Sequence, residues 1–317
     1  MTAIGKCEII LAVDAGVAQQ VEQLICNQQV RGSNPFTSLA VTIGYGFFIT
    51  LKTRKTAGQG MIEKTKSTKW ALITGASGSL GRELALLLAQ ENYSLILHYQ
   101  SNISACCKLL EDCQSISGKS ADNYLLWQAD FSDPAQLEAA LASVLKKIPY
   151  LNVLINNAAV DSYEMVNDIE WQSLQKLLQV NIAAPILLTK ACLPQLKAAA
   201  AVSAAQIINI SSIWGIYGAA METAYAASKG AINALTKSLA KELYDFPIRV
   251  NAIAPGLFTS KMNDRFSNAE ITAFVKEHSL LQRAADAREI AQTAQFLLSD
   301  RATYINGQIL EVSGAYI

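Results

Sequence analysis

Histidine, charge and paired cysteine are scarce in this sequence, and each shortage excludes a class of function. Only 2 of the 317 residues are histidines, and the 6 cysteines include no Cys-x-x-Cys pair, so we expect neither a metal site nor a disulfide framework. Lysine plus arginine equals aspartate plus glutamate at 26 each, which gives no electrostatic reason to expect nucleic acid as a partner. We therefore expect the cysteines to be reduced thiols in a cytoplasmic protein.

Long hydrophobic runs are also missing near the start of the chain. The longest one there, LAVTIGYGFFIT, has about a dozen residues, fewer than a bilayer-spanning helix needs. No basic segment precedes an apolar core and a cleavage site, so no signal peptide is expected either. We therefore expect no association with a membrane.

From residue 69 onward the sequence contains a regular alternation of two kinds of segment. Short aliphatic and β-branched runs, which predict strands, are WALIT, SLILHY, NYLLWQ, LNVLIN, AQIINIS, IRVNAIA and GQILEV. Amphipathic segments of helix length between them cover residues 79–91, 103–116, 134–147, 171–199, 223–244 and 286–299. Several strands are apolar throughout, as in a parallel sheet that helices cover on both faces. We expect one α/β domain over residues 61–317, with a doubly wound, Rossmann-type, seven-stranded parallel sheet.

A glycine-rich turn joins the first of these strands to the first helix. In ALITGASGSLGRELALLLAQ, Gly75, Gly78 and Gly81 recur at intervals of three residues. Glycine permits a tight turn and close approach to a pyrophosphate, and the helix N-terminus offers unpaired N–H groups to phosphates. The strand–turn–helix context favours a dinucleotide site over a plain turn. The contacts that we expect from this turn are Gly75, Ser77, Gly78, Ser79, Leu80 and Gly81.

A second stretch, INISSIWGIYGAAMETAYAASKGAINALTKSLAKEL, indicates proton chemistry. Tyr225 and Lys229 stand four residues apart at the start of a helix, so both project from one face. A tyrosine ordinarily has a pKa near 10, and a nearby ammonium group favours its phenolate. Ser212 ends a strand 13 residues upstream and can hold a carbonyl oxygen in the same pocket. A Y-x-x-x-K pair is commonplace by itself, and its combination with the serine and the glycine turn favours catalysis over a solvated pair.

Together these motifs resemble the short-chain dehydrogenase/reductase family over nearly all of residues 69–317. The family fingerprint T-G-x-x-x-G-x-G reads T-G-A-S-G-S-L-G here, with Ser79 at a usual glycine position. Ala159 replaces the glycine of the family's N-N-A-G strand end, and Ser260 replaces the threonine of its P-G-x-x-x-T segment. Further segments that match the family are VLINNAAV, QADFSD, NAIAPGLFTSKM and the end of the second strand. The resemblance therefore extends the expected cofactor site to Tyr99, Asp130, Phe131, Asn157, Tyr225, Lys229, Pro255, Gly256, Phe258 and Ser260.

The resemblance implies hydride transfer between nicotinamide C4 and a carbonyl carbon. Tyr225 would exchange the proton, and Ser212 would hydrogen-bond the oxygen. Lys229 would bind the nicotinamide ribose and lower the pKa of Tyr225, and Asn181, in LLQVNIAAP, would hold a water in the proton path. A dinucleotide-binding sensor or scaffold without catalysis is the alternative of another class. The combination of Ser212, Tyr225 and Lys229 argues against it.

Weaker signals concern the cofactor type and the substrate. The second strand ends LILHYQSN, without the acidic residue that would bind the ribose 2′-hydroxyl of NAD, which favours NADP(H) over NAD(H). Arg82 either contributes to this preference or is a solvated helix residue. The layout looks most like 3-oxoacyl-acyl-carrier-protein reductases, although the stretches that would contact an acidic carrier protein hold only Lys197 and include Asp245. A reductase of another ketone, sugar or steroid-like alcohol is the main alternative, with residues 257–285 as substrate lid.

The same resemblance implies self-association. Helices 171–199 and 223–244 commonly pair across a subunit interface in the family, and their many alanines would allow close approach. We therefore expect a homodimer or a homotetramer.

Residues 1–60 precede the expected start of the domain at Met61. Codons for residues 14–38 can be chosen so that they form all four arms of a tRNA gene in the right order. We therefore predict that residues 1–60 are a non-native, disordered leader, translated from a tRNA gene and intergenic sequence. A native disordered extension is the alternative.

Overall fold

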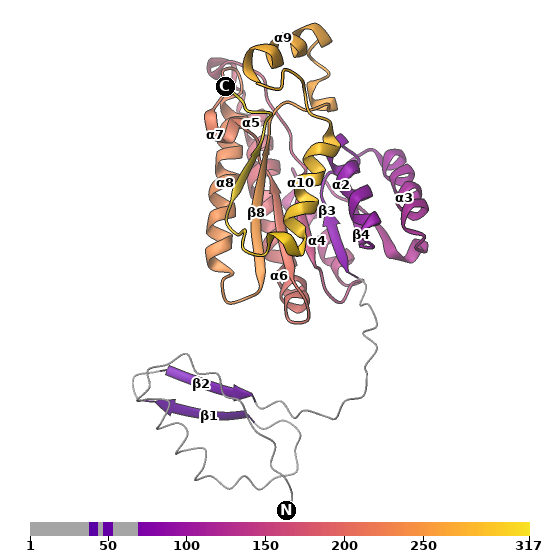
Figure 1. Cartoon of the computed structure of the whole chain (residues 1–317), viewed down its shortest axis with the longest axis vertical. Coiled ribbons are helices and arrows are strands. Elements are labelled where there is room, and N and C mark those ends of the chain that lie inside the picture. Colours follow the sequence, from indigo (N-terminus) through magenta and orange to yellow (C-terminus); the bar gives the residue numbers. More distant parts are fainter. Residues whose placement is uncertain (1–37, 44–46, 53–68) are drawn as a thin grey trace, which may run out of the picture. The chain divides into compact units, whose positions relative to one another are not determined.

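The structure is a computed structural model that describes residues 38–43, 47–52 and 69–317 (Figure 1). The chain divides into two units, Met1–Thr65 and Lys66–Ile317. In the first unit, β1 (Ser38–Ile43) and β2 (Phe47–Lys52) pair antiparallel. We expected no regular structure in this stretch, and its β-branched and aromatic residues, which favour strands, account for the difference. The segment predicted to derive from a tRNA gene lies outside the described residues, except for Ser38.

The second unit contains a seven-stranded parallel sheet, as predicted. Its strands are β3 (Trp70–Ile73), β4 (Ser94–Tyr99), β5 (Tyr124–Gln128), β6 (Val153–Asn156), β7 (Ala205–Ile210), β8 (Ile248–Pro255) and β9 (Ile309–Val312). Their order is β5-β4-β3-β6-β7-β8-β9, and every pairing is parallel. The direction of winding reverses between β3 and β6. In doubly wound sheets the ligand crevice lies beyond the carboxyl ends of the strands at this reversal.

Helices cover both faces of this sheet (Figure 1). On one face lie α2 (Ser79–Gln90), α3 (Ile103–Ser117) and α10 (Ala287–Leu298), and on the other lie α4 (Pro134–Leu145), α5 (Trp171–Leu178), α6 (Ala184–Ala200) and α8 (Thr223–Glu242). Two helices that the sequence did not predict are α7 (Trp214–Tyr217) and α9 (Asn268–His278). Short 3-10 turns are η1 (Ala121–Asn123), η2 (Val166–Asp168), η4 (Lys261–Asn263) and η5 (Asp300–Ala302).

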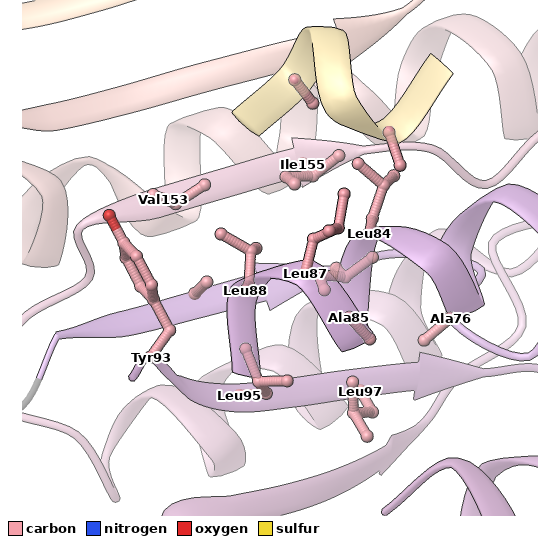
Figure 2. Packing of buried hydrophobic residues seen from close by; sticks show 14 of the residues in the cluster. Ala76, Leu84, Ala85, Leu87, Leu88, Tyr93, Leu95, Leu97, Val153 and Ile155 are labelled. Atoms are coloured by element: carbon pink, nitrogen blue, oxygen red, sulfur yellow. The ribbon is translucent and has the colours of Figure 1, made fainter. Parts of the chain in front are cut away.

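The strands supply two hydrophobic cores, one under each helical layer. Alternate residues of a strand point to opposite faces, so Ala71 and Ile73 face α2 while Leu72 faces α4 and α6. Figure 2 shows Leu84 and Leu88 of α2 among side chains of β4 and β6. Each leucine buried in this way contributes about 1.5–3 kcal/mol. Burial on both faces explains why these strands are apolar throughout.

The segment Trp171–Ala200 is long and apolar enough to cross a membrane by length and composition. In the fold, Leu177, Leu188 and Leu196 of this segment are at most 2% exposed. Packing inside the domain therefore accounts for much of its apolar character. The segment was predicted as one helix, but a π-helical turn, η3 (Gln179–Ala183), separates α5 from α6.

Candidate active site

The glycine turn between β3 and α2 forms the floor of the site. Gly75 adopts a φ of +63°, which disfavours other residues. A Cβ atom at Gly81 would lie 2.2 Å from the carbonyl oxygen of Gly75, so only glycine fits where the helix crosses the turn. The N-cap of α2 is Gly78, which has no side chain to cap the first turn. N–H groups at this helix start are therefore available to an anionic ligand such as a phosphate.

Neighbouring strands hold this turn by hydrogen bonds. Thr74 Oγ1 accepts from the backbone N–H groups of Asn157 at 2.8 Å and Ala158 at 2.9 Å. The Asn157 side chain donates to the carbonyl oxygens of Thr74 at 2.8 Å and Gly75 at 3.2 Å. Asn157 thus supports the turn from the end of β6, in the supporting role that the sequence predicted.

His98 is a further support that the sequence did not reveal. Its Nδ1 accepts from the backbone N–H of Gly75 at 2.9 Å, which leaves Nε2 to donate to the carbonyl oxygen of Ala129 at 3.1 Å. The ring stacks on Phe131 with centroids 4.1 Å apart. Burial lowers the pKa of His98 to about 4, so the imidazole is neutral at pH 7 and keeps its acceptor nitrogen.

A cavity of about 1030 Å³ opens above the turn and is large enough for a dinucleotide and a small substrate. It lies beyond the carboxyl ends of the strands, as predicted for the ligand. The predicted site residues that line it are Gly75, Ser77, Gly78, Ser79, Leu80, Gly81, Asp130, Phe131, Asn157, Ser212, Tyr225, Lys229, Pro255, Gly256, Phe258 and Ser260.

Three of the four predicted catalytic side chains come together on the wall of this cavity. Ser212 follows β7, and Tyr225 and Lys229 lie in the first two turns of α8; the Ser212 hydroxyl is close enough to Tyr225 to lower the pKa of its phenol. Lys229 Nζ donates to the carbonyl oxygen of Ile210 at 2.9 Å and lies 5.5 Å from the centre of the Tyr225 ring. All three side chains are buried, with 8% or less exposed.

Burial shifts the pKa of both ionisable members of this group towards the neutral form. It lowers the pKa of Lys229 to about 8. For Tyr225, burial and the nearby Glu222 carboxylate raise the pKa, and the Ser212 hydroxyl opposes them only in part. The lowering of the Tyr225 pKa that we expected from Lys229 does not appear in this structure, where burial sets the direction of the shift. Tyr225 is a protonated phenol at pH 7, ready to donate a proton.

The other end of the cavity has an aromatic and partly charged lining from α7, α9 and the C-terminus. Trp214 lies edge-on to Phe274 and Tyr316, with centroids 6.1 and 5.4 Å away. Arg265 forms an ion pair with Asp161 across the cavity mouth. Sequence reasoning did not identify these lid residues individually, because they come close to the site only in the folded chain.

Comparison with known proteins decides the family. Residues 75–316 match the family model described as enoyl-(acyl carrier protein) reductase. A 3-oxoacyl-[acyl-carrier-protein] reductase, FabG, of Staphylococcus aureus is 33% identical over 253 residues, which are 78% of this chain and 98% of that protein. The chain belongs to the short-chain dehydrogenase/reductase family. It is therefore an NAD(P)-dependent oxidoreductase that acts on CH–OH and C=O groups.

Other relatives of this short-chain dehydrogenase/reductase have different names. An uncharacterized oxidoreductase, YmfI, of Bacillus subtilis is 36% identical over 251 residues, which are 78% of this chain and 98% of that protein. Among solved structures, L-sorbose reductase from Gluconobacter frateurii, complexed with NADPH and L-sorbose, has a TM-score of 0.71 at 25% identity, over 78% of this chain and 96% of its own. The family is shared, while the substrates differ between relatives.

Two predicted site residues of this short-chain dehydrogenase/reductase lie outside the cavity lining. Tyr99 is 6% exposed and packs in the core under α2, because alternate residues of β4 point to opposite faces; its neighbours His98 and Gln100 line the cavity instead. Asn181 is 2% exposed in the π-helical turn, where its side chain bonds the backbone of Val160 and the hydroxyl of Ser228. In this arrangement the Asn181 amide anchors η3 to the loop after β6.

The end of the cavity near Asp130 contains one cation that the sequence did not single out. Asp130 accepts from the backbone and the hydroxyl of Ser132, which lowers its pKa, and Lys176 lowers it further. Lys176 itself lines the cavity. Arg82, the other candidate cation, pairs with Asp112 at 2.9 Å. This ion pair, with a side chain of Arg82 that is 44% exposed, favours the solvated helix residue that was the alternative for Arg82.

Proposed function

We propose that this protein reduces a ketone with NADPH and that a 3-oxoacyl thioester is the first candidate substrate. The observation that carries the proposal is the protonated Tyr225 beside Ser212 and Lys229, in a cavity whose floor is a glycine turn at a helix start. These residues fit a nicotinamide dinucleotide, because Gly81 has no room for a Cβ atom and the N-cap Gly78 leaves first-turn N–H groups for the phosphates.

The chain's own residues would bind, orient and supply a proton. The glycine turn would hold the pyrophosphate and the Lys229 ammonium the nicotinamide ribose. When bound, the cofactor supplies the hydride that reduces the carbonyl carbon. The Tyr225 hydroxyl would donate its proton to the carbonyl oxygen, and Ser212 would hydrogen-bond the same oxygen. The raised pKa keeps Tyr225 protonated, which suits the direction of reduction.

The preference for NADP(H) rests on the adenosine ribose end. The cavity residues that follow β4 are Gln100, Ser101 and Asn102, and none of them carries the carboxylate that repels a 2′-phosphate. Lys176 supplies a positive charge at the same cavity. We therefore propose that a 2′-phosphate is tolerated better than in an NAD-specific site.

Sequence identity supports a thioester substrate, whereas two features of the structure weaken that assignment. A named 3-oxoacyl-acyl-carrier-protein reductase is 33% identical to this chain over 98% of its length, which favours that substrate. The Lys197 side chain, however, stacks over Phe246 at 4.0 Å, so its contact with an acidic carrier protein is weakened. A carboxylate in the substrate end, Glu222, favours a different ketone or polyol as the second candidate.

We also propose a cytoplasmic homodimer or homotetramer that joins through α5, α6 and α8. The outer face of α5 and α6 supports this proposal because Trp171 is 67% exposed there and Ile186 is 45% exposed. A shallow groove on the same face is lined by Trp171, Gln175, Leu178, Gln179, Ile182 and Ala183.

The first test is steady-state reduction of acetoacetyl-CoA by the full chain, with NADPH and with NADH. We expect oxidation of NADPH, a higher kcat/KM with NADPH than with NADH, and loss of turnover in Tyr225→Phe. Unchanged turnover in Tyr225→Phe would contradict the proton-donor role. Turnover of acyl carrier protein thioesters above that of the CoA thioester would support the carrier protein as partner. Reduction of simple ketones without any thioester reduction would move the assignment to the second candidate.

A further inference from the structure

One carboxylate at the substrate end of the cavity has no role in the proposed proton transfer. Glu222 is the N-cap residue of α8 and stands three residues before Tyr225, so its side chain is a neighbour of Tyr225 along the helix surface. It lines the cavity and is half-buried. A substrate group close to the reacting carbonyl would therefore lie within reach of this carboxylate.

The charged groups around Glu222 leave its charge uncompensated. Within residues 69–317, no lysine or arginine forms an ion pair with it. Arg265 is paired with Asp161, and the Lys229 ammonium donates to the carbonyl oxygen of Ile210. Glu270, the other carboxylate of the lid that lines the cavity, accepts from Ser267 in the capping box of α9. His278 also lines the cavity; it contacts Glu277 at 3.9 Å, and its ring lies 4.7 Å from Phe274 and 5.8 Å from Tyr316.

Aromatic rings stand beside this carboxylate. Trp214 is close enough to Glu222 to lower the pKa of its carboxyl, and Trp214 in turn contacts Phe274 and Tyr316 edge-on. Trp214 is held firmly, because a Cβ atom on its neighbour Gly215 would lie 2.6 Å from the Lys229 backbone, so α7 and α8 are in close contact. The cavity thus places a carboxylate and several aromatic side chains around one space.

We propose that the substrate end of this cavity selects ketones, and the alcohols formed from them, that carry a positively charged nitrogen, with Glu222 as its counter-ion. The inference rests on the proposed carbonyl reduction but not on the thioester assignment. Carboxylates and aromatic rings are protein groups that attract a cation strongly in a partly desolvated site. An uncharged 3-oxoacyl group would also enter this cavity, but it would leave the Glu222 carboxylate without a partner.

The ionisation of Glu222 supports the inference. Burial raises its pKa to about 7, and the Trp214 side chain opposes this shift. A cation bound next to the carboxylate would favour its ionised form, so substrate binding and ionisation strengthen each other. A substrate with its own carboxylate or phosphate at this position would meet the opposite effect.

The test compares two ketones that differ only in charge. They are 1,1-dimethyl-4-oxopiperidinium, which is permanently cationic, and 4,4-dimethylcyclohexanone, its neutral isostere. With the full chain and NADPH, we expect kcat/KM to be about 10- to 100-fold higher for the cation. Glu222→Gln removes this preference and leaves the neutral ketone within about 3-fold, since a neutral amide keeps the size of the side chain and loses only its charge. Glu270→Gln is the matched control, because it neutralises the other lid carboxylate and keeps a capping residue; its preference should equal that of the wild type.

The ratio of the two kcat/KM values isolates Glu222 from the catalytic groups. Tyr225 and Lys229 act on both ketones alike, so their titration cancels in the ratio. We expect the preference for the cation to rise as the pH passes through about 7 in the wild type and in Glu270→Gln, and to stay flat in Glu222→Gln.

Equal kcat/KM for the two ketones in the wild type, or an equal loss for both in Glu222→Gln, would overturn the inference. If the neutral ketone is still reduced in that case, the proposed carbonyl reduction is not contradicted. Calorimetric binding of the two ketones in the presence of NADP+ is a second measurement that needs no turnover, and a cation bound no more tightly than its isostere overturns the inference as well. Failure to reduce these ketones and acetoacetyl-CoA alike would instead count against the proposed function.

Discussion

The two ends of the cavity are built in different ways. At the cofactor end, the backbone itself makes the site: Gly75 and Gly81 shape the turn, and His98 and Asn157 hold it from neighbouring strands. At the substrate end, the site consists of side chains from α7, α8, α9 and the C-terminus. The first kind of site tolerates few substitutions and binds a constant ligand, whereas the second can change its ligand through single residues.

Tyr225 stands where the two ends meet, and its replacement should have the largest effect. We expect Tyr225→Phe to lower kcat by about 10²- to 10⁴-fold at pH 7, because the proton donor is lost. The Kd for NADPH should change little, since the glycine turn is untouched. Stopped-flow measurement of hydride transfer and fluorescence titration with NADPH check the two statements separately. A loss of cofactor affinity as large as the loss of rate would contradict the division between the two ends.

The cofactor end should be sensitive to acid through His98. Its pKa is about 4 in the fold against 6.5 in an unfolded chain, so between these values the unfolded state binds a proton that the folded state does not. This contribution is absent above pH 6.5, and it lowers the free energy of unfolding by about 3 kcal/mol as the pH falls to 4.

The substitution His98→Asn removes this titration. Denaturant unfolding of both proteins at pH 7 and pH 4 measures the difference, and other groups that titrate alike in the two proteins cancel. We expect the stability advantage of the wild type over His98→Asn to shrink on acidification. Parallel pH curves would show that His98 does not stay neutral in the fold.

Gly81→Ala breaks the cofactor end more directly. The added Cβ atom would lie 2.2 Å from the Gly75 carbonyl oxygen, so the turn must shift. We expect affinity for NADPH to fall by about 10- to 100-fold through misplaced phosphate contacts. Gly230→Ala in α8 is the control, because its added Cβ atom meets nothing closer than 3.7 Å and alanine favours the helix. Equal affinities in the two variants would refute the steric argument.

The smallest expected effect is a shift in the titration of Tyr225. The Glu222 charge helps to raise the pKa of Tyr225, so Glu222→Gln should lower it. The basic limb of the pH profile for reduction of a neutral ketone should move to lower pH by less than about one unit. A shift to higher pH would show that the Glu222 charge does not reach the phenol.

The comparison also explains where prediction from sequence succeeded. The seven strands, the glycine turn and the grouping of Ser212 with Tyr225 follow from short-range spacing, because strand–turn–helix order and helical periodicity are local properties. The prediction for Tyr99 failed for an equally local reason, since the pleat of β4 decides which neighbour faces the cavity. Glu222 was within reach of sequence reasoning, as it lies one helical turn from Tyr225.

Other features depended on segments far apart in the chain. Asn181 meets Val160 and Ser228 only when α8 and the loop after β6 come together around the π-helical turn. The direction of the Tyr225 pKa shift depends on burial, which only the packed fold determines. The pairing of Arg265 with Asp161 joins the lid to the loop after β6.

The sequence by itself thus determined the doubly wound sheet and the residues of the cofactor turn, because hydrophobic periodicity and glycine spacing act over a few neighbouring residues. The tertiary structure alone decided which side chains surround the substrate and how strongly each proton is held. Those properties depend on desolvation and on contacts between distant segments, and neither exists until the chain has folded.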